Sequence, residues 1–73
     1  MNSRITVEVV KLPAARKSIA LFAGDSVHRA LIDAFGEEDY SKYTIVVNGN
    51  AASLNTSLQN GDCVTISKMV KGN

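Results

Sequence analysis

The stretch DSVHRALIDAFG, residues 25–36, decides the fold of this chain. Its apolar residues recur at spacings of three and four, the period of one face of an α-helix. They are Val27, Ala30, Leu31, Ala34 and Phe35, with Ile32 at the flank. Asp25 and Ser26 are good helix N-caps, and Gly36 suits the left-handed conformation that often ends a helix. The sequence therefore predicts a helix over 27–35 whose apolar face must pack on another element.

Strand-like segments surround this helix. After a polar link over 37–42, the β-branched and aromatic run YTIVV at 43–47 leads directly into Asn48-Gly49. Asn-Gly favours the positive φ angles of a type I′ turn, so a third strand should turn back into a short fourth strand over 50–52.

Before the helix, residues 4–11 alternate between apolar and polar, and residues 17–22 alternate again after a break that holds the only proline. This pattern is typical of a hairpin, with one side of the first strand facing the core. That inward set is Ile5, Val7 and Val9. After the predicted second hairpin, Leu54 and Leu58 anchor the segment 53–62, which ends in a turn. A last strand should then run from 63 to about 70, with Val64 and Ile66 facing inward.

A helix between two hairpins can hide its apolar face only by lying across their sheet. We therefore expect one two-layer α+β domain over 1–73, in the order strand, strand, helix, strand, short strand, strand. The mixed sheet should have four to five strands, with the first and last strands as central neighbours.

Composition limits the possible functions. Eight basic and seven acidic residues give a net charge near +1, which does not predict nucleic acid or an anionic membrane as a partner. No apolar run approaches the roughly eighteen residues that span a bilayer, and no signal peptide is evident, so a cytoplasmic location is expected. Cys63 and His28 are the only soft metal ligands in the sequence, so we expect no metal site and no bound cofactor.

No set of side chains suggests catalysis, and we do not expect an enzyme. His28 should lie on the polar side of the helix in solvent. Cys63 begins a strand and is interpreted as a small, partly buried hydrophobic residue. Two charge groupings are interpreted as solvated loop charge. They are Lys11, Arg16 and Lys17, and Glu37, Glu38 and Asp39.

The order of these motifs resembles a known family. Gly24-Asp25-Ser26-Val27 opens the helix, Val46-Val47-Asn48-Gly49 forms a hairpin, and Leu54, Leu58 and Asn60-Gly61-Asp62 precede the last strand. This succession, over nearly the whole chain, is similar to the sulfur-carrier proteins of thiamin and molybdopterin biosynthesis, bacterial relatives of ubiquitin. The resemblance implies a β-grasp (ubiquitin-like) fold and a sulfur-carrier-like or modifier-like function.

In that family the chemistry lies in the C-terminal tail, whose carboxylate is adenylated by a partner enzyme and then converted to a thiocarboxylate or joined to a lysine. The resemblance places this role on a flexible tail over 69–73, and in particular on Val70, Lys71, Gly72 and Asn73. The family ends in Gly-Gly, whereas here only Gly72 matches and Asn73 follows it. Removal of Asn73, a partner that accepts asparagine, deamidation of Asn73, and absence of activation all stay open.

The sheet face that the helix leaves uncovered is the second predicted site. If Ile5, Val7 and Val9 face the helix, then Val10, Val46 and Met69 point to the other side, where they could form an apolar binding patch. In the resembling family this face docks on the activating enzyme. The predicted partner is thus a protein, in the carrier hypothesis an ATP-dependent adenylating enzyme. The alternative hypothesis is an interaction module that uses this face without any tail chemistry.

Overall fold

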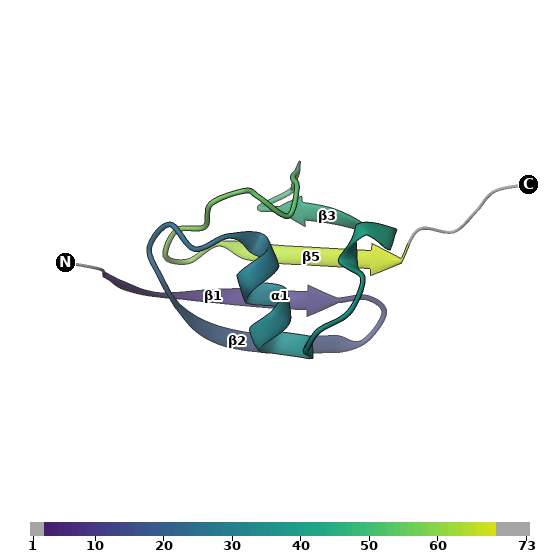
Figure 1. Cartoon of the computed structure of the whole chain (residues 1–73), viewed down its shortest axis with the longest axis horizontal. Helices are drawn as coiled ribbons and strands as arrows, with labels where there is room; N and C mark the ends of the chain where they lie inside the picture. Colours follow the sequence, from purple (N-terminus) through teal and green to yellow (C-terminus); the bar gives the residue numbers. More distant parts are fainter. Residues whose placement is uncertain (1–2, 69–73) are drawn as a thin grey trace, which may run out of the picture.

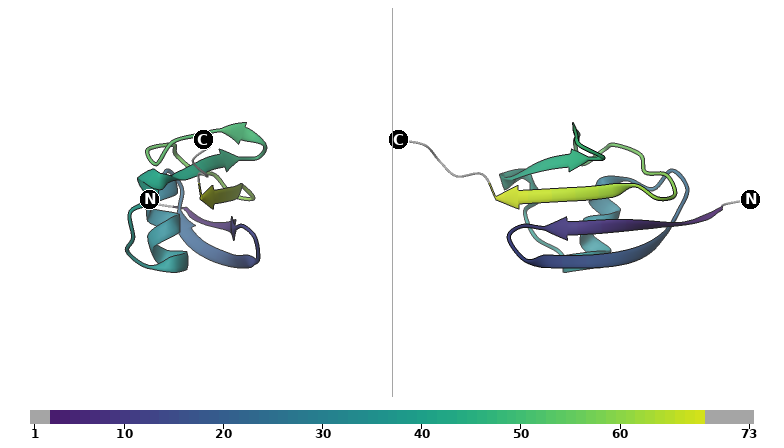
Figure 2. Two further views of the ribbon diagram at one scale, coloured as in Figure 1. Left: turned by 90° about the vertical axis from the view of Figure 1, so that its right-hand side faces the viewer. Right: turned by 180° about the vertical axis from the view of Figure 1, so that it is seen from behind.

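The computed structural model of the chain describes residues 3–68. Five strands form one sheet, and a single α-helix lies across one of its faces (Figures 1 and 2). In chain order the elements are β1 (Arg4–Lys11), β2 (Ala15–Phe22), α1 (Val27–Phe35), the short 3₁₀ helix η1 (Tyr40–Lys42), β3 (Tyr43–Val47), β4 (Asn50–Ala51) and β5 (Cys63–Lys68). This arrangement confirms the predicted two-layer α+β domain.

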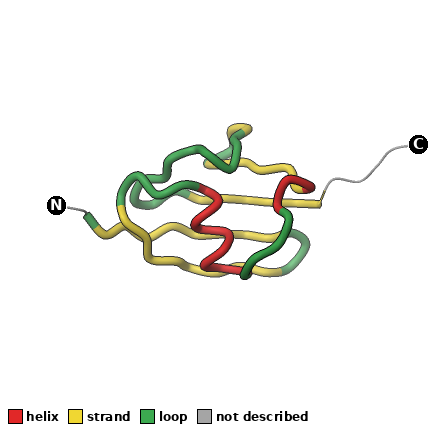
Figure 3. Tube along the Cα trace, in the orientation of Figure 1, coloured by secondary structure: helices red, strands yellow, loops and turns green. Residues whose placement is uncertain are grey.

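The sheet has the strand order β2-β1-β5-β3-β4. β1 and β5 run parallel in the middle, which confirms that the first and last strands are neighbours. The other pairs are antiparallel, so the sheet is mixed. Figure 3 shows the strands lying side by side with the helix crossing them. Because β5 is bonded to a strand on each side, its position is fixed more firmly than that of either edge strand.

The helix forms where its sequence pattern places it. The Ser26 hydroxyl accepts a hydrogen bond from the Arg29 amide at 3.3 Å, and Gly36 closes the helix at φ 88°. Asp25 does not cap the helix, contrary to expectation, because its carboxylate instead accepts a hydrogen bond from the Phe22 amide at the end of β2. Phe35 is half-buried, and the four residues of the stripe that are buried pack on the sheet. They are Val27, Ala30, Leu31 and Ala34.

The core lies between α1 and the inner face of the sheet. The predicted inward residues are buried, including Ile5, Val7 and Val9 on β1 and Val64 and Ile66 on β5. Removing these aliphatic side chains from water is the main stabilisation available to a chain of this size.

The link between α1 and β3 was predicted as polar, and this is wrong at one residue. Tyr40 is only 2 % exposed, and its hydroxyl lies within hydrogen-bonding distance of the carbonyl oxygens of Leu31 and Gly36 at the end of α1. The Gly36 carbonyl lies beyond the last helical hydrogen bond, which runs from the Gly36 amide to Ile32, so the tyrosine both fills the core and caps the helix end. The sequence alone shows an isolated aromatic residue among charges, which gives no periodicity to detect.

Strand bounds differ from expectation by one or two residues. β2 begins at Ala15, two residues before the predicted start, and β4 ends at Ala51. The type I′ turn is confirmed by positive φ angles at Asn48 (53°) and Gly49 (87°). β5 is described to Lys68, so its predicted continuation to about 70 lies outside the described residues.

Candidate functional site

The open face of the sheet, on the side away from α1, carries an aliphatic row that crosses four strands. The registers pair Val10 with Thr65, Thr65 with Val46, and Val46 with Ala51. Residues directly opposite one another project on the same face, so these four side chains stand in one line across the sheet. We call Val10, Thr65, Val46 and Ala51 the open-face row.

Val10 and Val46 project on the same face in the open-face row, but they are not direct neighbours. Thr65 stands between them, and two strand spacings separate the two valines by about 10 Å. Val10, Val46 and Thr65 are all half-buried. The third residue of the predicted patch, Met69, lies outside the described residues, as do the predicted tail residues Val70, Lys71, Gly72 and Asn73.

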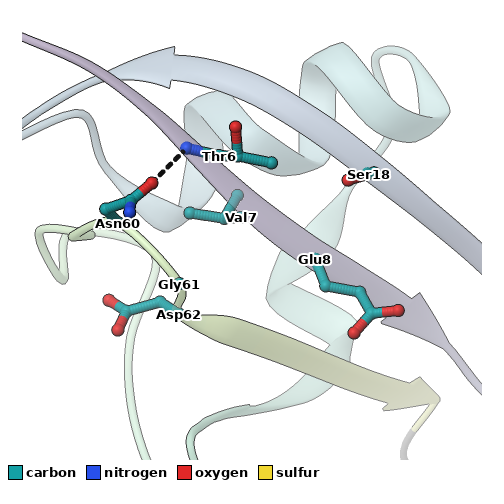
Figure 4. A pocket seen from close by; sticks show the side chains of 7 residues that line it. All are labelled: Thr6, Val7, Glu8, Ser18, Asn60, Gly61 and Asp62. Atoms are coloured by element: carbon teal, nitrogen blue, oxygen red, sulfur yellow. Dashed lines mark hydrogen bonds between the residues drawn. The ribbon is translucent and has the colours of Figure 1, made fainter.

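A polar groove of about 410 Å³ lies beside this row (Figure 4). Its lining residues, labelled in Figure 4, come from β1 and β2 and from the turn that leads into β5. That turn is tied to β1 by backbone hydrogen bonds from Gly61 to Thr6 (2.9 Å) and from Glu8 to Asp62 (3.0 Å). Many of the polar groups here are therefore already bonded within the chain, and the groove borders the row instead of forming a separate reactive site.

The residues with catalytic potential are not brought together. His28 is exposed on α1, which covers one face of the sheet. Cys63 pairs with Glu8 and therefore projects on the other face. A nucleophile and its base must lie within hydrogen-bonding reach, and the sheet separates these two. No group of three or more His, Cys, Asp or Glu side chains among residues 3–68 is arranged to hold a metal ion.

Lys11 and Glu38, one from each of the two charge groupings predicted to be solvated, contact each other, while the other members of both groupings are exposed. The Nζ atom of Lys11 lies 3.5 Å from the Glu38 carboxylate. It also lies 5.4 Å from the ring centre of Phe35 and 5.5 Å from the ring centre of Tyr43. The Tyr43 hydroxyl donates to Glu38. This hydrogen bond, followed by the charge of Lys11, holds the pKa of Glu38 below its usual range. Together these contacts fasten the link after α1 to the end of β1, close to where β5 ends beside Tyr43.

Strand order, mixed pairing and the single crossing helix define the class: the chain has a ubiquitin-like β-grasp fold. One similar solved structure is the ubiquitin of Caldiarchaeum subterraneum, with a TM-score of 0.62 over 97 % of this chain and 100 % of that one. The two sequences are 12 % identical, so the likeness concerns the fold and does not distinguish sulfur carriers from other ubiquitin-like proteins.

Sequence comparisons add no narrower grouping. No family model matches the chain. A search of curated proteins finds no match either. Within residues 3–68, no helix has the length and apolar character needed to cross a membrane.

Proposed function

We propose that this protein is a ubiquitin-like carrier or modifier that docks on a partner enzyme through the open-face row and delivers residues 69–73 to the partner's active site. The observation that supports this most is the place of β5. Thr65, at the centre of the row, lies on the strand that leads into residues 69–73. A partner that holds the row therefore also fixes the point from which the last residues start.

The geometry suits delivery of a chain end. β5 is bonded to β1 and to β3, so docking on the row positions a well-held strand. Five residues beyond Lys68 could span at most about 17 Å when extended. That reach is enough to enter a narrow channel while the row stays in contact with the enzyme surface.

In this proposal the chain is a substrate and not an enzyme. The resemblance to sulfur carriers assigns adenylation to the partner, which would bind ATP and magnesium. The carrier chain would contribute its surface and its terminal carboxylate, which agrees with the separation of His28 and Cys63 on opposite faces of the sheet.

The second function is an interaction module that binds through the open-face row alone. It is favoured by the position of the row, because all four of its residues lie within residues 3–68. The row itself involves none of the residues after Lys68, so it would serve such a module without change.

One modified chain separates the two functions in the native cell. A small folded tag after Asn73 should abolish the activity of a carrier, because the tag blocks entry into the partner's channel, whereas a module should tolerate it. Retained activity with the tag still attached would refute the carrier. The intact mass of the native protein gives independent evidence, since loss of Asn73, replacement of oxygen by sulfur, and a protein adduct each change it differently.

The docking surface is tested by Val46→Asp, with Thr44→Asp as the matched control. Both residues project on the open face from β3, but Thr44 lies opposite Ser67, one rung away from the row. We expect Val46→Asp to weaken partner binding strongly and Thr44→Asp to weaken it little. Equal effects of the two substitutions would show that the row is not the docking surface.

A further inference from the structure

β2 is an edge strand of eight residues, and no strand lies beyond it in the part of the chain that the structure describes. Six of its eight residues are exposed, so nothing within residues 3–68 covers it extensively. An edge of this length presents unpaired backbone groups on which another strand can form hydrogen bonds.

The register identifies which backbone groups are free. The Ala23 amide donates to the Ser3 carbonyl at 2.7 Å, so this pair exchanges hydrogen bonds between the strands. In an antiparallel ladder such pairs alternate with pairs that do not bond. Counting along the register, the odd-numbered residues of β2 bond to β1, and the even-numbered residues direct their N–H and C=O groups to the free edge.

The hydrogen bonds on the far side of β1 support this assignment. The Glu8 amide donates to Asp62, and the Thr6 carbonyl accepts from Gly61. Even-numbered residues of β1 therefore face β5, which leaves its odd-numbered residues for β2.

One end of the free edge is closed by the chain itself. Phe22 would be the last outward residue, but its amide donates to the Asp25 carboxylate and its carbonyl accepts from the Asp25 amide, both at 3.0 Å. Three residues of β2 remain with outward N–H and C=O groups. They are Arg16, Ser18 and Ala20.

We propose that this edge of β2 binds an extended acidic segment of a partner protein, which adds to the sheet as an antiparallel sixth strand. Three outward residues offer six backbone hydrogen bonds. The only charged side chains of β2 are Arg16 and Lys17, both at its beginning. Because neighbours in a strand project on opposite faces, a partner with two adjacent carboxylates could meet both cations, one on each face.

The side chains define the rest of the segment. Ile19 is half-buried on the helix side of the sheet and packs against the core. A partner residue directly opposite it should therefore be apolar. The partner strand runs antiparallel to β2, so its residues from N- to C-terminus lie opposite Ile19, Ser18, Lys17 and Arg16. The residue opposite Ile19 should be apolar and the one opposite Ser18 can be of any type. The two opposite Lys17 and Arg16 should be acidic.

A second copy of this chain fits the edge less well. Antiparallel pairing centred on Ser18 would set Arg16 opposite Ala20 and Lys17 opposite Ile19 of the second copy, so neither cation would gain a carboxylate from the other strand. Pairing centred on Lys17 would set two lysines directly opposite each other, which is destabilising. The charge of β2 thus favours an acidic partner over self-association.

This site is distinct from the proposed function, because it involves neither the open-face row nor residues 69–73. The test uses the full chain and a ten-residue peptide with the expected pattern, followed by amide NMR and hydrogen exchange. The amides of Arg16, Ser18 and Ala20 should exchange rapidly in the free protein and become protected on binding. The amides of Lys17 and Ile19 should already be protected by β1.

Two controls separate backbone addition from charge attraction. Methylating the peptide amides that face β2 should abolish binding, whereas methylating the intervening amides should leave it unchanged, and the protein is unaltered in both cases. Lys17→Glu should weaken binding by about fivefold. Lys42→Glu, which makes the same charge change at an exposed position on η1, should have little effect.

Four results would overturn the proposal: no binding at millimolar peptide, equal binding of a charge-reversed peptide, protection confined to the open-face row, or concentration-dependent protection of the same three amides without peptide. The last result would assign the edge to a second copy.

Discussion

Asn48→Asp tests how the β3–β4 turn is joined to the start of β5. The Asn48 side chain accepts a hydrogen bond from the Cys63 amide at 2.9 Å and donates one to the Asp62 carboxylate, also at 2.9 Å. The substitution keeps the acceptor but replaces the donor with an oxygen that carries negative charge. Two carboxylate oxygens would then face each other where a charge-assisted hydrogen bond stood.

The expected cost follows from two effects. A hydrogen bond to a charged group contributes about 1.5–3 kcal/mol, and two like charges about 4 Å apart repel by about 1 kcal/mol in water. The turn is exposed, so the two side chains can move apart and recover part of this loss. We expect the free energy of unfolding at neutral pH to fall by about 2 kcal/mol, which lowers Tm by about 10 °C in a domain of this size.

The loss should depend on pH in a defined direction. In the folded variant one of the two carboxyl groups retains a proton to higher pH than in the unfolded chain, because the proton replaces the lost amide hydrogen between the oxygens. The folded state then binds more protons, so stability falls as pH rises through this range. The deficit relative to the unmodified chain is therefore full at neutral pH, shrinks as pH falls through the raised pKa, and should be smallest below about pH 4.

Asn60→Asp is the matched control, since Asn60 also precedes a glycine but uses its side chain only as an acceptor, from the Thr6 amide at 2.9 Å. It should change stability by less than about 0.5 kcal/mol. Combining Asn48→Asp with Asp62→Asn exchanges donor and acceptor and should restore most of the loss. Urea unfolding followed by circular dichroism measures all four proteins. Equal stabilities of the Asn48→Asp and Asn60→Asp variants would refute the reasoning.

Three further predictions concern the core and the link after α1. Tyr40→Phe should lower the free energy of unfolding by about 1 kcal/mol in urea titrations, because a carbonyl oxygen at the end of α1 loses its donor; an unchanged midpoint would contradict this. Glu38→Gln should lose stability relative to the unmodified chain at neutral pH but not in acid. The pKa of Glu38 is lowered by the Tyr43 hydroxyl and by Lys11, so its contribution is present above the usual carboxyl range and is lost as pH falls through the lowered pKa. Thermal unfolding at several pH values checks this, and a pH-independent difference would disprove it. Leu58→Ala should cost about 3 kcal/mol, since Leu58 is fully buried, and calorimetry measures the loss; a cost below about 1 kcal/mol would mean that the cavity collapses.

Local signals in the sequence were sufficient for the elements themselves. Apolar residues spaced by three and four over 27–35 define α1. Asn48-Gly49 defines the turn between β3 and β4, because few residue pairs tolerate two positive φ angles. Alternation in β1 and β5 identified the inward residues. Each of these signals depends on neighbours in the chain, which is why each is readable without the fold.

The side-chain contacts of Tyr40 and Asp25 were not predictable in this way. Tyr40 lies in a charged link, and only the folded chain shows that its ring fills the space at the end of α1. Asp25 looks like a helix cap, but its carboxylate accepts from the Phe22 amide, three residues earlier at the end of β2. In both cases the backbone partner is within nine residues in the sequence, but several backbone groups are within reach and the sequence pattern does not show which one the side chain bonds.

The two proposed surfaces depend on register, which alternation does not supply. Alternation assigns Val10 and Val46 to one face, but only the pairing with Thr65 places them on a single rung. The same rung continues to Arg16 on β2, so Arg16 is a neighbour of the open-face row and also belongs to the free edge. Its guanidinium already pairs with Glu8 at 2.7 Å on that face. Lys17 projects on the opposite face and Val46 lies three strands away, so Lys17→Glu should weaken only edge binding and Val46→Asp only face binding. Arg16→Ala alone should weaken both, and an effect on neither would show that the two surfaces do not meet at this residue.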